Sequence, residues 1–474
     1  MLRHTQTFQS LLSGINGVSW PPIFNSRTAP LVALMHQLEE IQWLPAEVIS
    51  KHQHKQLVTL AEHANKYSAN FRVRMSAAKL KPTDLSTEKG LRKLPVLSRR
   101  ELQTSKEEIF CTMLPRAHAP IKVHRSTGST GEPVTVRRTA VNNLFYQATN
   151  LRENLWNQRD FSGTYAVIRA NLPEGITEMQ NWGEPYSWLF NTGPVYLKPI
   201  ATDIDQQVEW LKGINPDYLL TYPNNLTALL QEFEQLNLKL PRLRQIHTIG
   251  ETLTDEHRDY TRRIFNVEIT DTYSSEEVGT IALQCPESGL YHVMSESLIV
   301  EVLDEQGNPC RPGHIGRVVV TDLHNFATPL IRYDLNDYAE VGEACPCGRG
   351  LKVLKRIVGR SRNMLLLPDG RRHWPLFGVF RFTEIAPIRQ HQLIQRSREM
   401  IEVRLVADVS LTSEQETRLI DLIQNSLGYP FELKLVYFDE KIPRGKGGKF
   451  EEFACEIQSR DLESFGSSRK RKAP

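Results

Sequence analysis

The sequence predicts an α/β protein with two parts: a large multi-layer N-terminal domain with a β subdomain, and a small α+β C-terminal domain. Two observations predict this architecture. From Ile121 onward, short apolar runs alternate with helical patterns, which indicates parallel strands joined by helices. After Gly359, two strand patterns flank one helical pattern within about a hundred residues, the size of a small domain.

Helices dominate the first hundred residues. Apolar side chains recur at helical spacing from Leu57 to Asn70. The segment from Leu91 to Leu102 reads as a turn that starts a second helix at Ser98, because serine is a favoured N-cap residue.

Strand and helix patterns then alternate along the chain. The runs TYAVIR (164–169) and DYLLTY (217–222) read as strands, and NNLTALLQEFEQL (224–236) reads as a helix. Between Ser297 and Val341 the pattern becomes strand-rich, and SLIVEVLD and GRVVVTD predict a hairpin. This stretch is the expected β subdomain.

The C-terminal unit combines the strand MIEVRLVAD, the helix TSEQETRLIDLIQNSLG and the strand FELKLVYFD. A boundary near 360–363 gives domains at 1–360 and 361–460. Residues 461–474 end in SSRKRKAP, a basic low-complexity tail. A solvated, disordered end is favoured there over a localisation or nucleic-acid signal.

Composition excludes several classes of function. The net charge of +3 over 474 residues gives no strong bias toward a polyanionic partner, so nucleic acid is not indicated. The first twenty residues lack the unbroken apolar stretch of a signal peptide or membrane helix, and a cytoplasmic protein without a membrane partner is expected. Six cysteines are too sparse for a disulfide scaffold.

The segment RSTGSTGEPVTV (125–136) predicts a phosphate-binding loop. Its glycines let the backbone approach an anion, while amides and hydroxyls donate to phosphate oxygens. A P-loop NTPase is rejected, because Glu132 and Pro133 follow the last glycine where lysine is required. Alone, such a run could also be a flexible surface turn, which is the less favoured alternative. The residues concerned are Ser126, Thr127, Gly128, Ser129, Thr130 and Gly131.

This loop resembles the phosphate-binding signature of the acyl-adenylate-forming ligases, and four further segments match that superfamily in the same order. PTDLSTEKGLRKLPVLSRREL and TPLIRYDLND look like its phenylacetate-CoA ligase branch. The resemblance runs from about Leu57 into the C-terminal domain. It implies a large α/β domain with a mobile α+β lid, and ATP as the nucleotide.

The segment DTYSSEEVG (271–279) resembles the family motif Tyr-Gly-x-Ser/Thr-Glu. By this resemblance Tyr273 lies against adenine and Glu277 is the carboxylate linked to Mg²⁺, whose hard oxygen ligands suit that role. Ser274 replaces the family's glycine and Glu276 its Ser/Thr. The choice between the two glutamates therefore stays open, and exposed glutamates in a solvated turn are a common alternative.

Two more segments complete the expected nucleotide site. Gly250 and Glu251 in TIGETL would form the loop on the other side of the base. In IRYDLND, Asp337 matches the aspartate that the family places against the ribose hydroxyls, and a carboxylate can accept two hydrogen bonds from a vicinal diol. Asp334 is the nearer alternative, and either residue could cap a turn.

The C-terminal segment IPRGKGGKF resembles the family's Pro-Arg-Thr-x-x-Gly-Lys loop. With Pro443 and Arg444 in register, Lys449 falls at the adenylation lysine, and Lys446 is the competing candidate. Its ammonium would bridge the attacking carboxylate and the α-phosphate when the small domain closes. A glycine/lysine surface loop is the alternative.

The expected hinge lies in VGRSRNM, where the family commonly carries Gly-Arg-x-Asp-Asp. Arg360 matches the arginine and is assigned to the nucleotide site. Arg362 and Asn363 replace the two acids, which weakens the case for the second, acyl-transfer step more than for the first.

Three cysteines and one histidine supply the ligand set of a closed tetrahedral zinc site. Their spacing differs from zinc-finger pairs, so buried free thiols are an equal alternative on pattern alone. Some members of the phenylacetate-CoA ligase branch carry a similar set, which favours a structural zinc that does not activate water. The residues are Cys285, His292, Cys345 and Cys347.

The sequence thus predicts an acid–thiol ligase that forms acyl-AMP and transfers the acyl group to coenzyme A, with a small carboxylic acid as substrate and a possible homodimer. Adenylation coupled to amide or ester formation, as in the capsule-biosynthesis-like relatives, is one alternative. A non-catalytic nucleotide-binding homologue is the other. A weak preference for an aromatic or apolar acid comes from Trp182, Tyr186, Trp188 and Phe190, which could equally be packing residues.

Overall fold

The chain is described by a computed structural model that covers residues 11–126, 133–172, 175–360, 364–369, 371–373, 382, 385–443, 450 and 452–457. It divides into two compact units, Met1–Ile357 and Val358–Pro474. This division lies three residues before the boundary expected at 360/361. Each unit has its own hydrophobic core.

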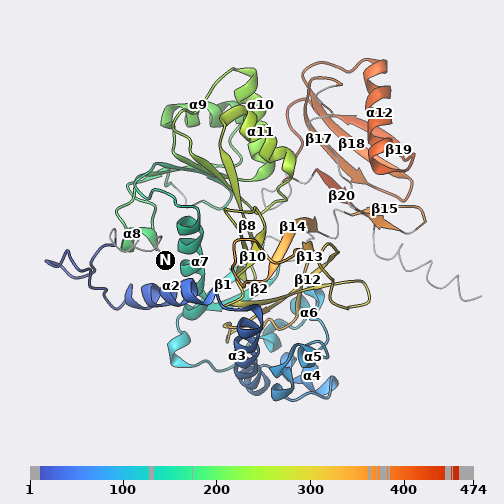
Figure 1. The fold of residues 1–474 in the computed structure, drawn as a ribbon. Coiled ribbons are helices and arrows are strands. Elements are labelled where there is room, and N and C mark those ends of the chain that lie inside the picture. Colours follow the sequence, from blue (N-terminus) through green and yellow to red (C-terminus); the bar gives the residue numbers. More distant parts are fainter. Residues whose placement is uncertain are drawn as a thin grey trace, which may run out of the picture. The chain divides into compact units, whose positions relative to one another are not determined.

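A twelve-stranded mixed sheet forms the frame of the first unit (Figure 1). Its order is β11-β12-β13-β14-β10-β9-β8-β7-β6-β3-β5-β4. The strands are β3 (Tyr165–Arg169), β4 (Glu178–Met179), β5 (Val195–Pro199), β6 (Tyr218–Thr221), β7 (Gln245–Ile249), β8 (Glu268–Ser275), β9 (Gly279–Gln284), β10 (Tyr291–Val293), β11 (Leu298–Leu303), β12 (Ile315–Asp322), β13 (Tyr333–Val341) and β14 (Val353–Arg360).

One half of this sheet is parallel, as the alternation of strands and helices predicted. Strands β5, β3, β6, β7 and β8 are parallel neighbours. Helices α9 (Ile204–Ile214), α10 (Pro223–Gln235) and α11 (Asp255–Phe265) lie together beside it (Figure 1). Pro223 occupies the first turn of α10, where its missing N–H costs no helical hydrogen bond.

The other half is antiparallel. Strands β11 and β12 form the predicted hairpin, with Leu298 opposite Asp322 and Leu303 opposite Arg317. Most of their residues are buried on both faces, in keeping with the apolar runs in the sequence. A separate two-stranded ribbon, β1 (Ile121–Arg125) and β2 (Thr135–Thr139), flanks the expected phosphate loop.

The first unit also contains the N-terminal helices and α7, which packs against α2 and β9. The remaining helices of this unit are α2 (Ala29–Ile41), α3 (Ala46–Tyr67), α4 (Ala69–Ala77), α5 (Glu88–Leu91), α6 (Arg99–Thr104), α7 (Ala140–Trp156) and α8 (Tyr186–Leu189), with 3₁₀ turns η1 (Pro82–Ser86), η2 (Lys106–Ile109) and η3 (Arg116–His118).

Helix α6 begins where the sequence predicted. The Ser98 hydroxyl accepts from the Glu101 N–H at 3.1 Å, and the Glu101 carboxylate accepts from the Ser98 N–H at 2.8 Å, which is a capping box. Leu97 is tied to β13: its N–H donates to the carbonyl of Arg332, the residue before β13, at 2.7 Å, and its carbonyl accepts from the Asp334 N–H at 2.9 Å. The start of α6 is therefore fixed against the antiparallel half of the sheet.

The second unit is the predicted α+β domain. Its four-stranded sheet has the order β19-β18-β17-β20, and α12 contributes Leu419, Ile423 and Leu427 to the core. Gly428 ends α12 at φ +66°, a left-handed conformation that favours glycine. The elements are β15 (Leu365–Leu366), β16 (Arg372–His373), β17 (Ile388–Gln395), β18 (Met400–Ala407), α12 (Ser413–Leu427), β19 (Glu432–Tyr437) and β20 (Phe453–Cys455).

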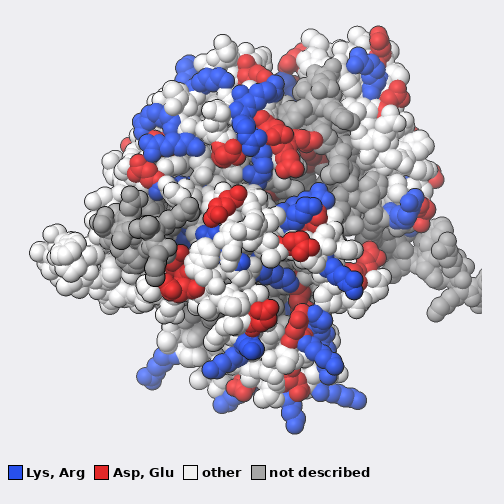
Figure 2. Space-filling model, in the orientation of Figure 1, with Lys and Arg blue, Asp and Glu red and all other residues white. Residues whose placement is uncertain are grey.

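Two surface properties bear on the class of protein. Among the described residues, every helix is too short or too polar to cross a bilayer. On the face drawn in Figure 2, acidic and basic side chains are intermixed rather than gathered into one basic surface. This matches the small net charge of +3.

Candidate active site and metal centre

Ser126 lies at the base of the expected phosphate loop, where β1 and β2 converge. Its N–H donates to the Val134 carbonyl at 2.9 Å, and its hydroxyl accepts from the Val134 N–H at 2.9 Å. The loop residues Thr127, Gly128, Ser129, Thr130 and Gly131 lie outside the described residues. Their assignment to phosphate stays a prediction, and the β1–β2 hairpin fixes where the loop starts and ends.

Arg99 connects Ser126 to Glu277, which lies 151 residues further along the chain. One guanidinium nitrogen, Nη2, donates to the Ser126 hydroxyl at 2.8 Å, and the other, Nη1, contacts Glu277 Oε1 at 2.9 Å. The side chains of Arg99 and Glu277 are 19% and 8% exposed, so screening of this ion pair by solvent is limited. Arg99 therefore ties the phosphate loop to the acidic motif.

The two candidate glutamates differ in their surroundings. Glu277 is buried and paired with Arg99, whereas Glu276 is exposed. Both lie in the connection between β8 and β9, where Ser275 pairs with Gly279. The geometry thus favours Glu277 as the carboxylate that faces the start of the phosphate loop.

Tyr273 and Asp337 are in direct contact. The Tyr273 hydroxyl donates to Asp337 Oδ2 at 2.8 Å, joining β8 to β13. Asp334, the alternative ribose ligand, is engaged elsewhere: it pairs with Arg317 at 3.1 Å and accepts from the Asn336 N–H at 2.8 Å. Burial raises the pKa of Asp334. Asp337 is therefore the aspartate that shares a site with Tyr273.

Gly250 and Glu251 follow the carboxyl end of β7, next to the β8 strand that carries Tyr273. Ile249 pairs with Thr272, so Gly250 and Tyr273 come at the same level of the sheet. Gly250 has φ +76°, which favours glycine, and Glu251 Oε2 accepts from the Asn224 N–H at 3.1 Å. Ligands commonly bind at this carboxyl edge of parallel strands. Ser274, the next residue of β8, is exposed there.

Several predicted residues are not brought to the site by the described structure. Lys449, Lys446 and Arg444 lie outside the described residues, as do Arg362 and Asn363. Arg360 ends β14 and Pro443 precedes the undescribed lysine loop. The roles of these residues stay predictions.

The aromatic residues proposed to line an acyl pocket pack mainly against one another. Phe161 stacks on Phe190 with ring centroids 4.1 Å apart, and Trp182 contacts Tyr186 edge-on at 5.9 Å. Trp182 is 6% exposed and its indole N–H donates to the Gly163 carbonyl at 2.9 Å. The packing alternative is thus the one that the contacts support.

Arg99 was not predicted as a site residue from the sequence. A signal for it exists: Arg99 and Arg100 occupy the first turn of α6, next to the positive end of the helix dipole, where cations are disfavoured. A cation held at that position is consistent with an anionic partner, here Glu277.

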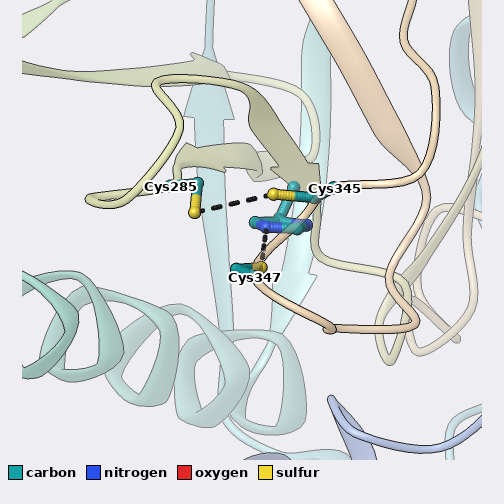
Figure 3. Close-up of side chains that lie close together, drawn as sticks. Cys285, Cys345 and Cys347 are labelled. Atoms are coloured by element: carbon teal, nitrogen blue, oxygen red, sulfur yellow. Dashed lines mark hydrogen bonds between the residues drawn. The ribbon is translucent and has the colours of Figure 1, made fainter.

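The four predicted zinc ligands converge. Cys285 follows β9, His292 lies on β10, and Cys345 and Cys347 lie between β13 and β14. Their ligand atoms all lie within 4.8 Å of one another. Figure 3 shows the three cysteines around one small space, with Cys285 Sγ 3.8 Å from Cys345 Sγ; Cys347 Sγ lies 3.3 Å from His292 Nε2.

These distances fit one tetrahedral ion. Thiolates bound to zinc at about 2.3 Å lie about 3.8 Å apart along a tetrahedral edge. The Cys285–Cys345 separation of 3.8 Å matches that edge. The Ser288 hydroxyl lies 3.1 Å from Cys345 Sγ, within reach to donate to a thiolate. The residues present therefore fit a closed Cys₃His zinc site.

The comparisons with known proteins agree with the fold and the motifs. No protein-family model matches the chain. The phenylacetate-coenzyme A ligase of Thermus thermophilus is 24% identical over 353 residues, which are 70% of this chain and 75% of that protein. The Escherichia coli phenylacetate-coenzyme A ligase is 22% identical, covering 87% of this chain and 96% of that protein.

Two further similarities extend this comparison. Protein CapK of Staphylococcus aureus is 27% identical over 207 residues, which are 42% of this chain and 44% of that protein. The crystal structure of a 2-hydroxyisobutyryl-CoA ligase with 2-HIB-AMP in the postadenylation state superposes with a TM-score of 0.70 at 16% identity, covering 90% of this chain and 92% of that chain. At this identity the likeness shows a shared fold.

The fold and the ordered motifs are similar to those of the acyl-adenylate-forming superfamily. Over most of its length the chain is similar to phenylacetate-coenzyme A ligases, at 22–24% identity. The predicted fold class and family are thereby confirmed.

Proposed function

We propose that this chain activates a carboxylic acid with ATP, forming acyl-AMP and pyrophosphate, and then transfers the acyl group to the thiol of coenzyme A. One observation carries the proposal. Arg99 contacts both Ser126, at the start of the expected phosphate loop, and Glu277, in the acidic motif, and this contact between two of the five resembling segments supports a shared site.

The first step brings two anions together, because the acid's carboxylate must attack the α-phosphate of ATP. Loop amides and hydroxyls from 126 to 131 would donate to the triphosphate, and Lys449 would offset the charge that develops between the reacting oxygens. Asp337 would accept from the ribose hydroxyls, and Tyr273 would pack against the base.

Glu277 is the proposed ligand for Mg²⁺. A magnesium ion bound to the phosphates would neutralise the charge of the departing pyrophosphate. Arg99 contacts one of the two carboxylate oxygens, Oε1. Arg99 thereby fixes the orientation of Glu277 and acts as a positioning residue. The zinc held by the Cys₃His cluster would be structural, since all four positions come from the protein.

A second candidate differs only in the acceptor. An amine or hydroxyl would take the place of the thiol, as expected for capsule-biosynthesis-like relatives, and the similarity to protein CapK is the observation that supports this candidate. The adenylation chemistry would be the same. The cytoplasmic location and the homodimer expected from the sequence stay predictions.

Acid-dependent release of pyrophosphate tests the proposal. The purified protein is incubated with ATP, Mg²⁺ and a panel of aliphatic, aromatic and dicarboxylic acids, and then with coenzyme A, amines or sugars. Release with at least one acid is expected, together with a coenzyme A thioester. Release without a thioester, but with an amide or ester, would favour the second candidate. No release with any acid would support a non-catalytic nucleotide-binding protein.

Replacing each glutamate in turn tests which of the two is the Mg²⁺ ligand. We expect Glu277→Gln to lower the rate of adenylation about a hundredfold and to raise the Mg²⁺ concentration needed for half-maximal rate, because a charged metal ligand is lost. Glu276→Gln removes the same charge from an exposed position, so less than about a threefold change is expected. A larger effect at Glu276 would show that the motif register is shifted by one residue.

A further inference from the structure

Arg332 is a buried arginine in a strained backbone conformation, and the proposed chemistry does not use it. It directly precedes β13 and has φ +55°, in the left-handed region that favours glycine. Such a conformation persists only where the surrounding structure fixes it, and it is common at functional sites. The contacts of Arg332 must therefore hold this turn of the chain in place.

The side chain of Arg332 forms a bidentate ion pair with Glu301 on β11. Nε donates to Glu301 Oε2 at 2.9 Å, and Nη2 donates to Glu301 Oε1 at 3.0 Å. The two side chains are 5% and 8% exposed, so solvent screens this pair little. Two parallel hydrogen bonds fix the plane of the guanidinium, and they thereby set the direction of its third nitrogen, Nη1.

Nη1 of Arg332 contacts the segment that leads into α6. It donates to the Arg92 carbonyl at 2.9 Å and to the Leu94 carbonyl at 2.6 Å, which lie 240 and 238 residues away along the chain. The carbonyl of Arg332 in turn accepts from the Leu97 N–H at 2.7 Å. Both the side chain and the backbone of Arg332 therefore hold the segment before α6.

A second buried arginine, Arg74 of α4, makes the same connection. Its Nη2 donates to the Pro95 carbonyl at 2.6 Å and to the Ile331 carbonyl at 3.0 Å. Burial lowers the pKa of Arg74 to about 10, so this arginine stays charged at neutral pH. Two guanidinium groups thus join the segment before α6 to the residues before β13.

The two joined segments lead to two parts of the proposed nucleotide site. The first continues into α6 and Arg99, which contacts Ser126 and Glu277. The second continues along β13 to Asp337, which accepts from the Tyr273 hydroxyl. Helix α6 and β13 lie in contact (Figure 1). The spacing of these two parts of the site therefore depends on the arginine contacts between their segments.

We propose that Arg332 is a positioning residue that keeps Arg99 at a fixed distance from the strand carrying Asp337. The inference rests on the proposed function and adds to that site a residue that needs no contact with ATP or with the acid. Because Arg332 acts through Arg99, its loss weakens the use of ATP and leaves the use of the acid almost unchanged.

Replacing the buried pair in the full-length protein tests this inference. Arg332→Lys keeps the charge but cannot supply the fork and the two carbonyl contacts together. It is expected to lower kcat/KM for ATP about tenfold to a hundredfold, the effect of misplacing a group by about 1 Å, and to change KM for the acid by less than about threefold. The double variant Arg332→Met, Glu301→Gln leaves neither partner charged and should show the same loss.

Arg152→Lys is the matched control. Arg152 of α7 pairs with Glu296 at 2.8 Å, and the two side chains are 4% and 5% exposed, so this pair is as buried as that of Arg332. Its guanidinium also donates to the Leu38 carbonyl of α2. Chemical unfolding should show a similar loss of stability in Arg152→Lys and Arg332→Lys, with kcat/KM for ATP lowered only in Arg332→Lys. An equal fall in both variants would assign Arg332 to general stability and overturn the inference.

A double-mutant cycle tests whether Arg332 acts through Arg99. Calorimetric titration of ATP with Mg²⁺, without any acid, measures binding to the unsubstituted protein, to Arg99→Gln, to Arg332→Lys and to the protein with both changes. Each single change should weaken binding, and the second change should add little to the first, because residues that act as one unit are not additive. Additive losses would show that Arg332 acts independently and would overturn the inference.

The same titrations keep the inference separate from turnover. If no acid supports pyrophosphate release, but ATP binds and Arg332→Lys weakens that binding while Arg152→Lys does not, the proposed function fails and the positioning role stands. If release occurs and Arg332→Lys binds ATP as Arg152→Lys does, the proposed function stands and the inference fails. Absence of ATP binding to the unsubstituted protein would overturn both.

Discussion

Lys449→Ala is expected to lower the rate of acyl-AMP formation by about a hundredfold to a thousandfold, the scale seen when one stabilising group is removed from a charged transition state. The reason is electrostatic: without the ammonium, repulsion between the carboxylate and the α-phosphate is less compensated. Binding of ATP should change little, because the phosphate loop and Asp337 remain.

The measurement separates the two half-reactions. Pyrophosphate release reports the first step, and thioester formation from chemically prepared acyl-AMP reports the second. Lys449→Ala should impair only the first, because acyl transfer is expected to use a different face of the C-terminal domain. Lys446→Ala removes the same charge from the same loop and is the control. If it abolishes release while Lys449→Ala does not, the motif register is wrong.

Local patterns were sufficient to predict most of the fold. The Ser98 and Glu101 capping box, the hairpin of β11 and β12, and the strands and helix of the C-terminal unit follow from residues near one another in sequence. Such features depend on hydrophobic period and helix capping, which can be read from the chain directly.

The contacts of the site could not be predicted in the same way. Arg99 and Glu277 are 178 residues apart, and nothing local specifies their pairing. The choice between Glu277 and Glu276 depends on which of the two is buried against α6, and this is set by the tertiary structure. Arg138 and Arg137 are adjacent and chemically alike. Successive side chains of a strand point to opposite faces, so the two arginines of β2 have different neighbours.

The aromatic residues show a second limit of the sequence. Tryptophan and tyrosine near a phosphate loop can be read as an acyl pocket, because aromatic side chains line many ligand sites. In this chain Phe161 packs against both Trp182 and Phe190. Burial of the large apolar surfaces of these rings is sufficient to explain why aromatic residues occur at these positions. Sequence alone does not distinguish these outcomes.

Loss of one of the four proposed zinc ligands should destabilise the first unit strongly. Cys345→Ser is expected to lower its free energy of unfolding by about 4 kcal/mol, because zinc binding is coupled to folding and the cluster joins three separate segments. Cys310→Ser, at a half-buried cysteine outside the cluster, should change stability by less than about 1 kcal/mol. Zinc content by mass spectrometry and chemical unfolding with and without a chelator measure both effects.

Cys345→Ser should also weaken binding at the proposed nucleotide site. His292 lies beside Tyr291 on β10, and the Tyr291 hydroxyl donates to Asp271 Oδ2 at 2.8 Å, on the strand that carries Tyr273 two residues later. Release of β10 would therefore loosen the support of Tyr273, and a higher KM for ATP is expected in Cys345→Ser before the protein unfolds. Two results together would contradict this prediction: the unsubstituted protein contains no zinc after purification with added zinc, and it unfolds at the same denaturant concentration as Cys345→Ser. The four residues would then be free thiols and a buried imidazole.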